Sequence, residues 1–308
     1  MNLSQLRFAD AVARAGSFTK AAAECRVTQP TLSNGIAQLE YELGDRLFVR
    51  TTRSVAPTPF GSVVLPYIAQ VLGAQASLLQ QASKFLNPEQ RLLRIGTSPL
   101  ISAHRIGMLL EPFRREFPNV NVVLREANMT DLQRMLESGL IDFMFGVSEI
   151  HKGSNTAFLY DEPLLFIPRG SEWHGRSSAR SVQLKDITGE TYVMVPDACG
   201  LSRATRALFQ AQRSKLHEYP GEALSYQVLE EWAALGIGAA ILPQSKITAG
   251  RQVFFSIRDL SGHPATIAFQ AVWPAIDKRA KHLLGFARHL RRSKAKNAEV
   301  RAHSKLGA

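Results

Sequence analysis

The strongest constraint on the fold is a run near the N-terminus in which three alanines and a short polar turn separate two helical patterns. The run covers residues 18–40 and reads FTKAAAECRVTQPTLSNGIAQLE. The alanines at 21–23 have side chains small enough to let a neighbouring helix approach closely. Gly16 suits the end of a preceding helix, and Ser17 and Thr28 suit the caps of the next two. The run therefore predicts three short helices packed together.

The third predicted helix has an apolar stripe and an uncharged polar surface. The stripe consists of Leu32, Ile36, Leu39 and Leu43, which recur at helical spacing. Amides and hydroxyls on the other side can reach base edges in a major groove, while the helix N-terminus faces a phosphate. Plain solvation of an exposed helix is the alternative explanation. The polar set is Gln29, Pro30, Thr31, Ser33, Asn34 and Gln38.

A basic hairpin is predicted after Gly44. Residues 45–58 read as two short strands and a turn, and they carry Arg50 and Arg53. Guanidinium groups at the tip of such a wing would neutralise phosphates or enter the minor groove, which adds salt-sensitive affinity. Residues 1–58 thus have the pattern of a winged helix-turn-helix domain.

One long linker helix is predicted over residues 59–89. Thr58 can cap it and Pro59 suits its first turn, whereas Pro66 should kink it or limit its first turns. Its apolar residues have the spacing of a helix that packs against another helix, so we interpret it as a dimerisation arm. They are Leu65, Ile68, Leu72, Ala76, Leu79 and Leu86.

Residues 90–292 alternate between strand and helix patterns, which predicts parallel α/β layers covered by helices. The chain leaves one lobe, at about 90–162, builds a second at about 163–265 and returns to the first at 266–292. A cleft between two such lobes binds small molecules. The expected strands are 92–97, 120–126, 140–147, 163–168, 191–196, 238–243 and 266–273.

Composition and charge narrow the class further. The net charge is +11, and residues 276–308 hold ten Lys/Arg against two acids, so the tail at 293–308 is predicted to be basic and disordered. No apolar run approaches about 18 residues and no signal peptide is visible, which favours the cytoplasm. The two cysteines, Cys25 and Cys199, lack any disulfide or metal-ligand spacing. We expect no cofactor and no metal.

The run AAAECRVTQPTLSNGIAQLEYELGDRLFVRTTRSVAPTPFG closely resembles the signature of LysR-type transcriptional regulators, and the resemblance extends in order over the whole chain. It implies a winged helix, a linker helix and an effector domain similar to a periplasmic solute-binding protein. It also implies promoter DNA as a partner, a homodimer through the linker helices, assembly into a homotetramer, and RNA polymerase as a further partner. By resemblance, Gln29, Pro30, Thr31 and Ser33 lie near bases, and Thr28, Arg50 and Arg53 lie near phosphates. Asn34 departs from the arginine of many relatives.

The expected effector site lies where strands end and helices begin, because exposed NH groups there favour a carboxylate or similar anion. An organic acid with an aromatic or aliphatic part is the expected effector. Capping of helices alone is the other explanation for Ser98 and Ser202. The candidate residues are Thr97, Ser98, Leu100, Ile101, Phe145, Val147, Pro196, Cys199 and Ser202.

The sequence disfavours three other functions. Cys199 near a helix N-terminus suggests redox sensing, but redox-sensing members of the family use two cysteines in the effector domain and this domain has one. No nucleophile-elbow, zinc-protease, P-loop or dinucleotide motif is present, so we do not expect an enzyme. A solute-binding protein of a transport system would explain two lobes, but not residues 1–89 or the missing signal peptide.

Overall fold

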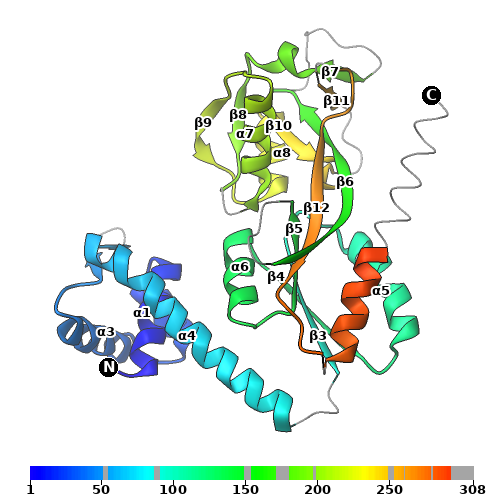
Figure 1. The fold of residues 1–308 in the computed structure, drawn as a ribbon. Helices are drawn as coiled ribbons and strands as arrows, with labels where there is room; N and C mark the ends of the chain where they lie inside the picture. Colours follow the sequence, from blue (N-terminus) through cyan, green and yellow to red (C-terminus); the bar gives the residue numbers. More distant parts are fainter. Residues whose placement is uncertain are drawn as a thin grey trace. The chain divides into compact units, whose positions relative to one another are not determined.

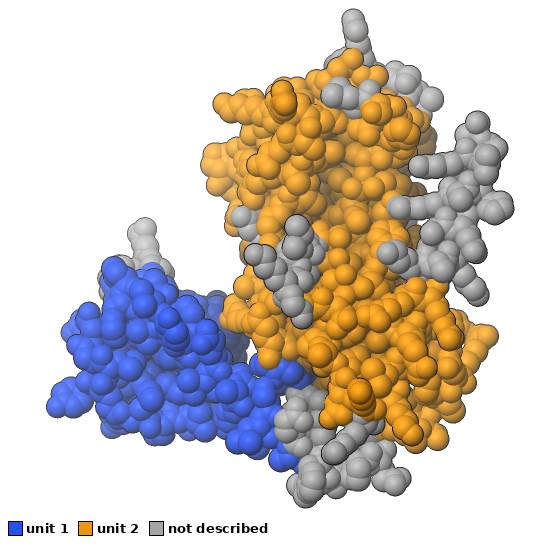
Figure 2. All heavy atoms as spheres, in the orientation of Figure 1, with its two compact units in different colours: residues 1–88, 138–140 blue, residues 89–137, 141–308 orange. Residues whose placement is uncertain are grey.

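The computed structural model describes residues 1–50, 55–86, 91–148, 154–170, 180–196, 199–248, 253–259, 261–278 and 280–292. The chain divides into two compact units (Figure 2). The first contains residues 1–88 with 138–140, and the second contains residues 89–137 with 141–308. The tail at 293–308, predicted to be disordered, lies outside the described residues.

Three short helices form the core of the first unit, which confirms the prediction. They are α1 (Leu3–Ala15), α2 (Phe18–Cys25) and α3 (Gln29–Leu43). Gly16 and Gly44 end α1 and α3 in the left-handed conformation, with φ of 58° and 91°. Other residue types rarely adopt this conformation, so glycine stops both helices at defined points.

The caps and the buried face agree with the sequence pattern. The Ser17 and Thr28 side chains accept hydrogen bonds from the backbone NH groups of Lys20 and Thr31 at the starts of α2 and α3. Ala21 and Ala22 of α2 are buried in the helix–helix contact, as are Leu32, Ile36 and Leu39 of α3, whereas Ala23 is exposed. The buried set includes Leu6, Ala9, Val12, Ala21, Ala22, Leu32, Ile36 and Leu39.

A two-stranded wing follows α3, as predicted. β1 (Phe48–Arg50) pairs antiparallel with β2 (Val55–Pro57). The Glu40 carboxylate of α3 accepts hydrogen bonds from the NH groups of Leu47 at 2.7 Å and Phe48 at 3.3 Å. A charged acceptor with two donors is strong, so α3 holds the start of the wing in place.

The linker helix α4 (Pro59–Leu86) begins as predicted, because the Thr58 hydroxyl accepts from the NH of Gly61 at 2.8 Å. It continues through Pro66, which therefore does not limit its first turns. The predicted end at Asn87 and Pro88 lies outside the described residues.

The first half of the predicted apolar seam of α4 packs within its own unit, whereas we expected the whole seam to face a second helix in a dimer. Leu65, Ile68 and Leu72 pack against the core of their own unit. A different row stays exposed, including Val63 at 64% and Leu78 at 69%. Residues 59–79 carry no charge and, by length and composition alone, would also suit a membrane span, although polar residues interrupt the run. A single helix of this kind is weak evidence for a membrane span, because helices of soluble proteins can have the same length and apolar composition.

The second unit contains two lobes. In lobe one, β3 (Leu92–Thr97) lies between β4 (Asn121–Glu126) and β5 (Phe143–Val147), and all three are parallel. α5 (Ala103–Glu116) and the helix at 281–292 cover one face of this sheet, and α6 (Met129–Glu137) covers the other (Figure 1). This doubly covered layer confirms the α/β prediction for the first lobe.

Two long strands run between the lobes side by side (Figure 1): β6 (Asn155–Ile167) and β12 (Thr266–Trp273). The prediction placed a strand only at 163–168, whereas β6 begins at Asn155. β12 pairs antiparallel with both β5 and β6, so the sheet is mixed and not purely parallel. The returning chain adds its strand in the opposite direction, which local periodicity does not reveal.

Lobe two is built on the second half of β6, which pairs antiparallel with two strands, β10 and β11. The short or exposed strands β7, β9 and β11 were not predicted; β9 has the polar sequence HEYPGE. The elements are β7 (Ser181–Gln183), η1 (Leu184–Ile187), β8 (Thr191–Met194), α7 (Leu201–Ala211), β9 (His217–Glu222), α8 (Tyr226–Ala234), β10 (Ala240–Pro243), η3 (Gln244–Lys246) and β11 (Phe255–Arg258).

Replacing Gly61 by alanine tests the packing of α4 on the wing. A Cβ at Gly61 would meet the Leu47 carbonyl oxygen at 2.0 Å, so the backbone must shift. We expect Gly61→Ala to destabilise the first unit by about 1–3 kcal/mol. Gly107→Ala is the matched control, because nothing lies within 4 Å of that helical position. It should be neutral or stabilise by up to about 1 kcal/mol. Thermal unfolding of the full chain measures both, and a Gly61→Ala transition at the parent temperature would contradict the packing described.

Candidate functional site

The first two turns of α3 carry an exposed, uncharged surface. Leu32, Ile36 and Leu39 point into the core, and the opposite side chains face solvent. Thr28 caps this end, and its hydroxyl also lies 2.8 Å from that of Thr31. Gln29, Pro30, Thr31 and Asn34 are exposed and Ser33 is half-buried. The residues predicted to contact DNA from this helix thus lie together at its N-terminal end: Thr28, Gln29, Pro30, Thr31, Ser33 and Asn34.

The wing arginines are less fully described. Arg50 ends β1, opposite Val55 of β2. Its side chain and the whole of Arg53 lie outside the described residues. Their expected contacts with phosphates therefore stay predictions.

The predicted effector residues of lobe one lie where β3 and β5 end. Thr97 is paired with Glu126 and with Phe145, and the Ser98 NH donates to the Phe145 carbonyl at 2.9 Å. Ser98 is fully buried, and its hydroxyl oxygen accepts from the Leu100 NH at 3.3 Å. Leu100, Ile101 and Phe145 are buried in the core of the second unit. These three side chains pack inside the protein and do not line an open surface.

The start of α7 in lobe two meets lobe one. Gly200 has φ of 81°, and a Cβ there would lie 3.1 Å from Val147 Cγ2 and 3.3 Å from Met129 Cγ. The end of β5 and the start of α6 therefore lie against the N-terminus of α7, and we call this place the inter-lobe junction. The half-buried Cys199 lies beside it, with its NH donating to the Pro196 carbonyl at 2.9 Å.

Ser202 lies inside lobe two. Its side chain is 1% exposed, and its hydroxyl donates to the Val195 carbonyl at 2.5 Å. It also lines a small cavity of about 10 Å³ among apolar residues of that lobe. This hydroxyl is thus engaged within its own lobe, while Thr97, Ser98, Val147, Pro196 and Cys199 lie near the inter-lobe junction.

Three polar residues at the inter-lobe junction were missed by the sequence analysis: Glu126, Tyr226 and Lys246. Glu126 ends β4 beside Thr97, Tyr226 begins α8, and Lys246 ends η3 directly after β10. The Lys246 Nζ lies 5.9 Å from the centre of the Tyr226 ring. The effector site is expected where strands end and helices begin. Glu126 and Tyr226 occupy such positions, and Lys246 lies in the short η3 that directly follows the end of β10.

The surroundings of the Cys199 thiol favour its protonated form. Burial raises its pKa, and Glu222 adds to that, while the nearby Tyr226 hydroxyl acts in the opposite direction. Burial is also the main reason why the pKa of Tyr226 is raised, with Cys199 and Glu126 contributing. A thiol with a raised pKa is a poor nucleophile at neutral pH, because the thiolate is the reactive form.

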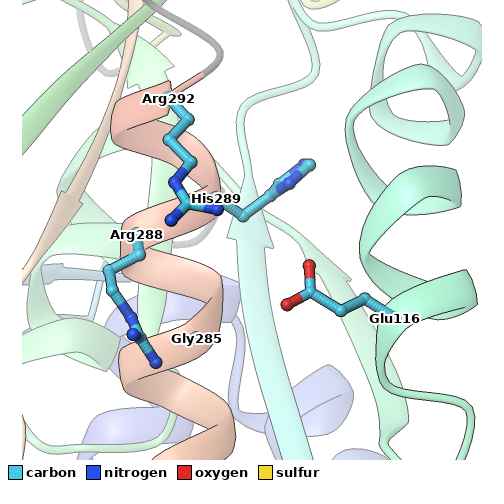
Figure 3. Close-up of a pocket in the computed structure, with 5 residues that line it drawn as sticks. All are labelled: Glu116, Gly285, Arg288, His289 and Arg292. Atoms are coloured by element: carbon cyan, nitrogen blue, oxygen red, sulfur yellow. The ribbon is translucent and has the colours of Figure 1, made fainter.

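A second pocket lies on lobe one, away from the inter-lobe junction. It holds about 90 Å³ and is lined by Glu116 of α5 and by Gly285, Arg288, His289 and Arg292 of the helix at 281–292 (Figure 3). The His289 ring bonds to the Leu109 carbonyl at 3.0 Å. The Glu116 carboxylate extends toward the helix that carries the two arginines, so an anion here would meet a negative charge as well as positive ones.

No group of three or more His, Cys, Asp or Glu side chains that could hold a metal ion occurs within the described ranges.

Comparison with known proteins assigns both parts of the chain to one family. Residues 3–62 match the bacterial regulatory helix-turn-helix protein family of the lysR type, and residues 87–295 match the LysR substrate binding domain. The chain is 30% identical over 257 residues to a "Hydrogen peroxide-inducible genes activator" of Pectobacterium carotovorum subsp. carotovorum, covering 82% of this chain and 83% of that protein. It is likewise 30% identical over 257 residues to the "DNA-binding transcriptional dual regulator OxyR" of Escherichia coli (strain K12), with 82% of each covered.

The fold matches full-length members. The crystal structure of CbnR, a LysR family transcriptional regulator, superposes with a TM-score of 0.61 at 19% identity, covering 96% of this chain and 99% of that one. The helix-turn-helix match excludes the alternative of a transport solute-binding protein, which would lack this unit. Membership also implies an intracellular protein and no enzymatic activity.

An exposed polar α3 beside a wing, a long linker helix and a two-lobed domain therefore have one explanation: the chain belongs to the LysR family of DNA-binding transcriptional regulators with an effector-binding domain.

Proposed function

We propose that this regulator reads promoter DNA with the first two turns of α3 and is switched by a small organic acid bound at the inter-lobe junction. The observation that carries the DNA part is the exposed, uncharged surface opposite Leu32, Ile36 and Leu39. Amide and hydroxyl groups suit base edges, and the NH groups of the helix N-terminus suit a phosphate. Gln29, Pro30, Thr31, Ser33 and Asn34 face the bases, and Thr28, Arg50 and Arg53 face the backbone.

The exposed apolar row of α4 supports a homodimer. Val63, Tyr67, Val71, Leu78 and Leu79 are exposed on one helix. Large apolar side chains on a single helix are buried when a second copy packs along it. Such a dimer places two copies of α3 in successive major grooves, about 34 Å apart. Two dimers form a tetramer in the cytoplasm, where the complex contacts RNA polymerase.

The switch depends on different affinities of the effector for two arrangements of the regulator. The junction joins strand ends of lobe one to the N-termini of α7 and α8, and helix N-termini favour anions. Lys246 places a positive charge at the same location. A differential affinity of about 1–3 kcal/mol between two quaternary states is enough to change promoter binding.

Peroxide sensing is the second candidate, since the Pectobacterium relative is named for hydrogen peroxide induction. Two observations favour the organic acid instead. Burial raises the pKa of Cys199, and the remaining cysteine, Cys25, belongs to α2 of the other unit. A reactive thiol with a resolving partner in the same domain is therefore missing from the sequence.

Substitutions on α3 and the wing separate base reading from phosphate binding. Gln29→Ala should weaken binding to the cognate promoter by about 1–3 kcal/mol and leave bulk DNA binding unchanged. Arg50→Ala should weaken binding to all duplexes and lower the slope of log K against log salt by about 1. Fluorescence anisotropy titrations at several salt concentrations measure both. An unchanged salt slope for Arg50→Ala would remove Arg50 from the phosphate contacts.

Cys199→Ser separates organic-acid from peroxide sensing. Because its thiol pKa is raised, Cys199 should react with iodoacetamide at pH 7 more slowly than free cysteine does. The Cys199→Ser variant should bind promoter DNA like the parent before and after peroxide treatment, and should keep its response to organic acids. Mobility-shift assays with and without peroxide test this. A parent protein that responds to peroxide and a variant that does not would establish redox sensing instead.

A further inference from the structure

Two opposite charges meet at the inter-lobe junction without forming an ion pair. Glu126 of lobe one is exposed and Lys246 of lobe two is half-buried, so solvent reaches both. Neither has an ion-pair partner within 4 Å among the residues that the structure describes. Charges held close together and left unpaired are available to a ligand that carries charges of the opposite signs.

Tyr226 lies near both charges. The Lys246 Nζ is 5.9 Å from its ring centre, and Glu126 is near enough to contribute to the raised pKa of its hydroxyl. Glu126 also acts on Lys246, whose pKa is lowered mainly by burial. Glu126, Tyr226 and Lys246 therefore form one group, which we call the junction cluster.

The Tyr226 hydroxyl is a buried donor without an acceptor in the part of the chain that the structure describes. Its oxygen has no hydrogen-bond partner there, although the Cys199 thiol is close enough to interact weakly. Leaving a buried polar group unpaired costs stability, so such a group in a native protein calls for a specific explanation. A ligand atom that accepts its hydrogen bond supplies one.

The balance of charge narrows the chemistry of that ligand. Besides Glu126, the carboxylates of Glu222 and Glu162 lie near the same groups, whereas Lys246 supplies the positive charge there. Glu162 is buried and accepts from the Ser245 NH, next to Lys246. A ligand with carboxylates alone would pair with Lys246 and be repelled by Glu126. A ligand that also carries an ammonium group would satisfy both.

We propose that the effector is a zwitterionic amino acid, whose carboxylate pairs with Lys246 and accepts from the Tyr226 hydroxyl while its ammonium group pairs with Glu126. This rests on the proposed effector function of the inter-lobe junction and narrows the organic acid to one that carries an amino group. Lys246 and Glu126 are then the residues that determine specificity.

The test uses the full-length protein and three matched sets of compounds. The first set is the twenty L-amino acids. The second is the corresponding acids without the amino group, such as propionate for alanine and succinate for aspartate, and the third is the corresponding amines. Thermal shift identifies the amino acid that binds, and isothermal titration calorimetry gives its affinity. We expect each half-analogue to bind about tenfold more weakly than the amino acid, because each loses one of the two ion pairs and leaves one protein charge without its counter-charge.

Variants assign the two ends of the ligand. Glu126→Gln should abolish the preference for the amino acid over its amino-free analogue, whereas Lys246→Met should weaken binding of both. Lys185→Met, an exposed lysine of η1, should change neither. Promoter binding without effector should be unchanged in Lys185→Met, which lies outside the junction cluster.

The outcomes distinguish this inference from the proposed function. Equal binding of the amino-free acid, or binding of carboxylates but of no amino acid, would overturn the zwitterion and leave organic-acid control intact. If neither class binds and another class of metabolite changes promoter affinity, both fail. An amino acid that binds equally well to Glu126→Gln and Lys246→Met would remove the junction cluster from recognition.

Discussion

The antiparallel pair of β6 and β12 holds the second unit together, because each lobe depends on the same strands. Their register runs from Asn155 opposite Trp273 to Pro163 opposite Thr266, and β6 then continues into lobe two to pair with β10 and β11. A ladder of backbone hydrogen bonds resists stretching but can twist, and the register shift between Phe269 and Gln270 adds a local irregularity. Rotation of one lobe on the other would therefore occur around this pair.

Several buried polar side-chain atoms near the boundary of the two lobes lack hydrogen bonds within the described part of the chain. The hydroxyl oxygens of Tyr160 and Tyr226 and one carboxylate oxygen of Glu162, Oε2, are buried and have no hydrogen-bond partner among the described residues. Tyr160 and Glu162 lie on β6 where it passes between the lobes, and Arg105 of α5 covers the Tyr160 ring at 4.8 Å. Proteins tolerate such local conflicts where function requires them. Glu162 and Tyr226 both lie near Lys246, which agrees with a junction that gains contacts when a ligand binds.

The helices of the first unit could be predicted from local sequence patterns, whereas part of β6 and the strand β9 of the second unit could not. Thr28, Gly44 and the stripe of Leu32, Ile36 and Leu39 act within one helix, so caps and periodicity were enough to predict α3 and its exposed surface. The first half of β6 was missed because its sequence, NTAFLYDE, mixes polar and apolar residues without strict alternation. The strand β9 was missed because it is exposed and contains a proline. Both form because neighbouring strands supply hydrogen bonds that no local pattern records.

Local sequence patterns were enough to predict the family, the three-helix unit with its caps, and the alternation that builds two lobes, because each of these depends on residues close together in the chain. Three features appear only in the folded molecule: the part of the apolar surface of α4 that stays exposed, the burial of Ser202 in lobe two, and the shared position of Glu126, Tyr226 and Lys246. Glu126 and Lys246 are separated by many strands and helices along the chain. The return of β12 beside β6 is what brings their lobes together, so their charges become neighbours only after the whole unit has folded.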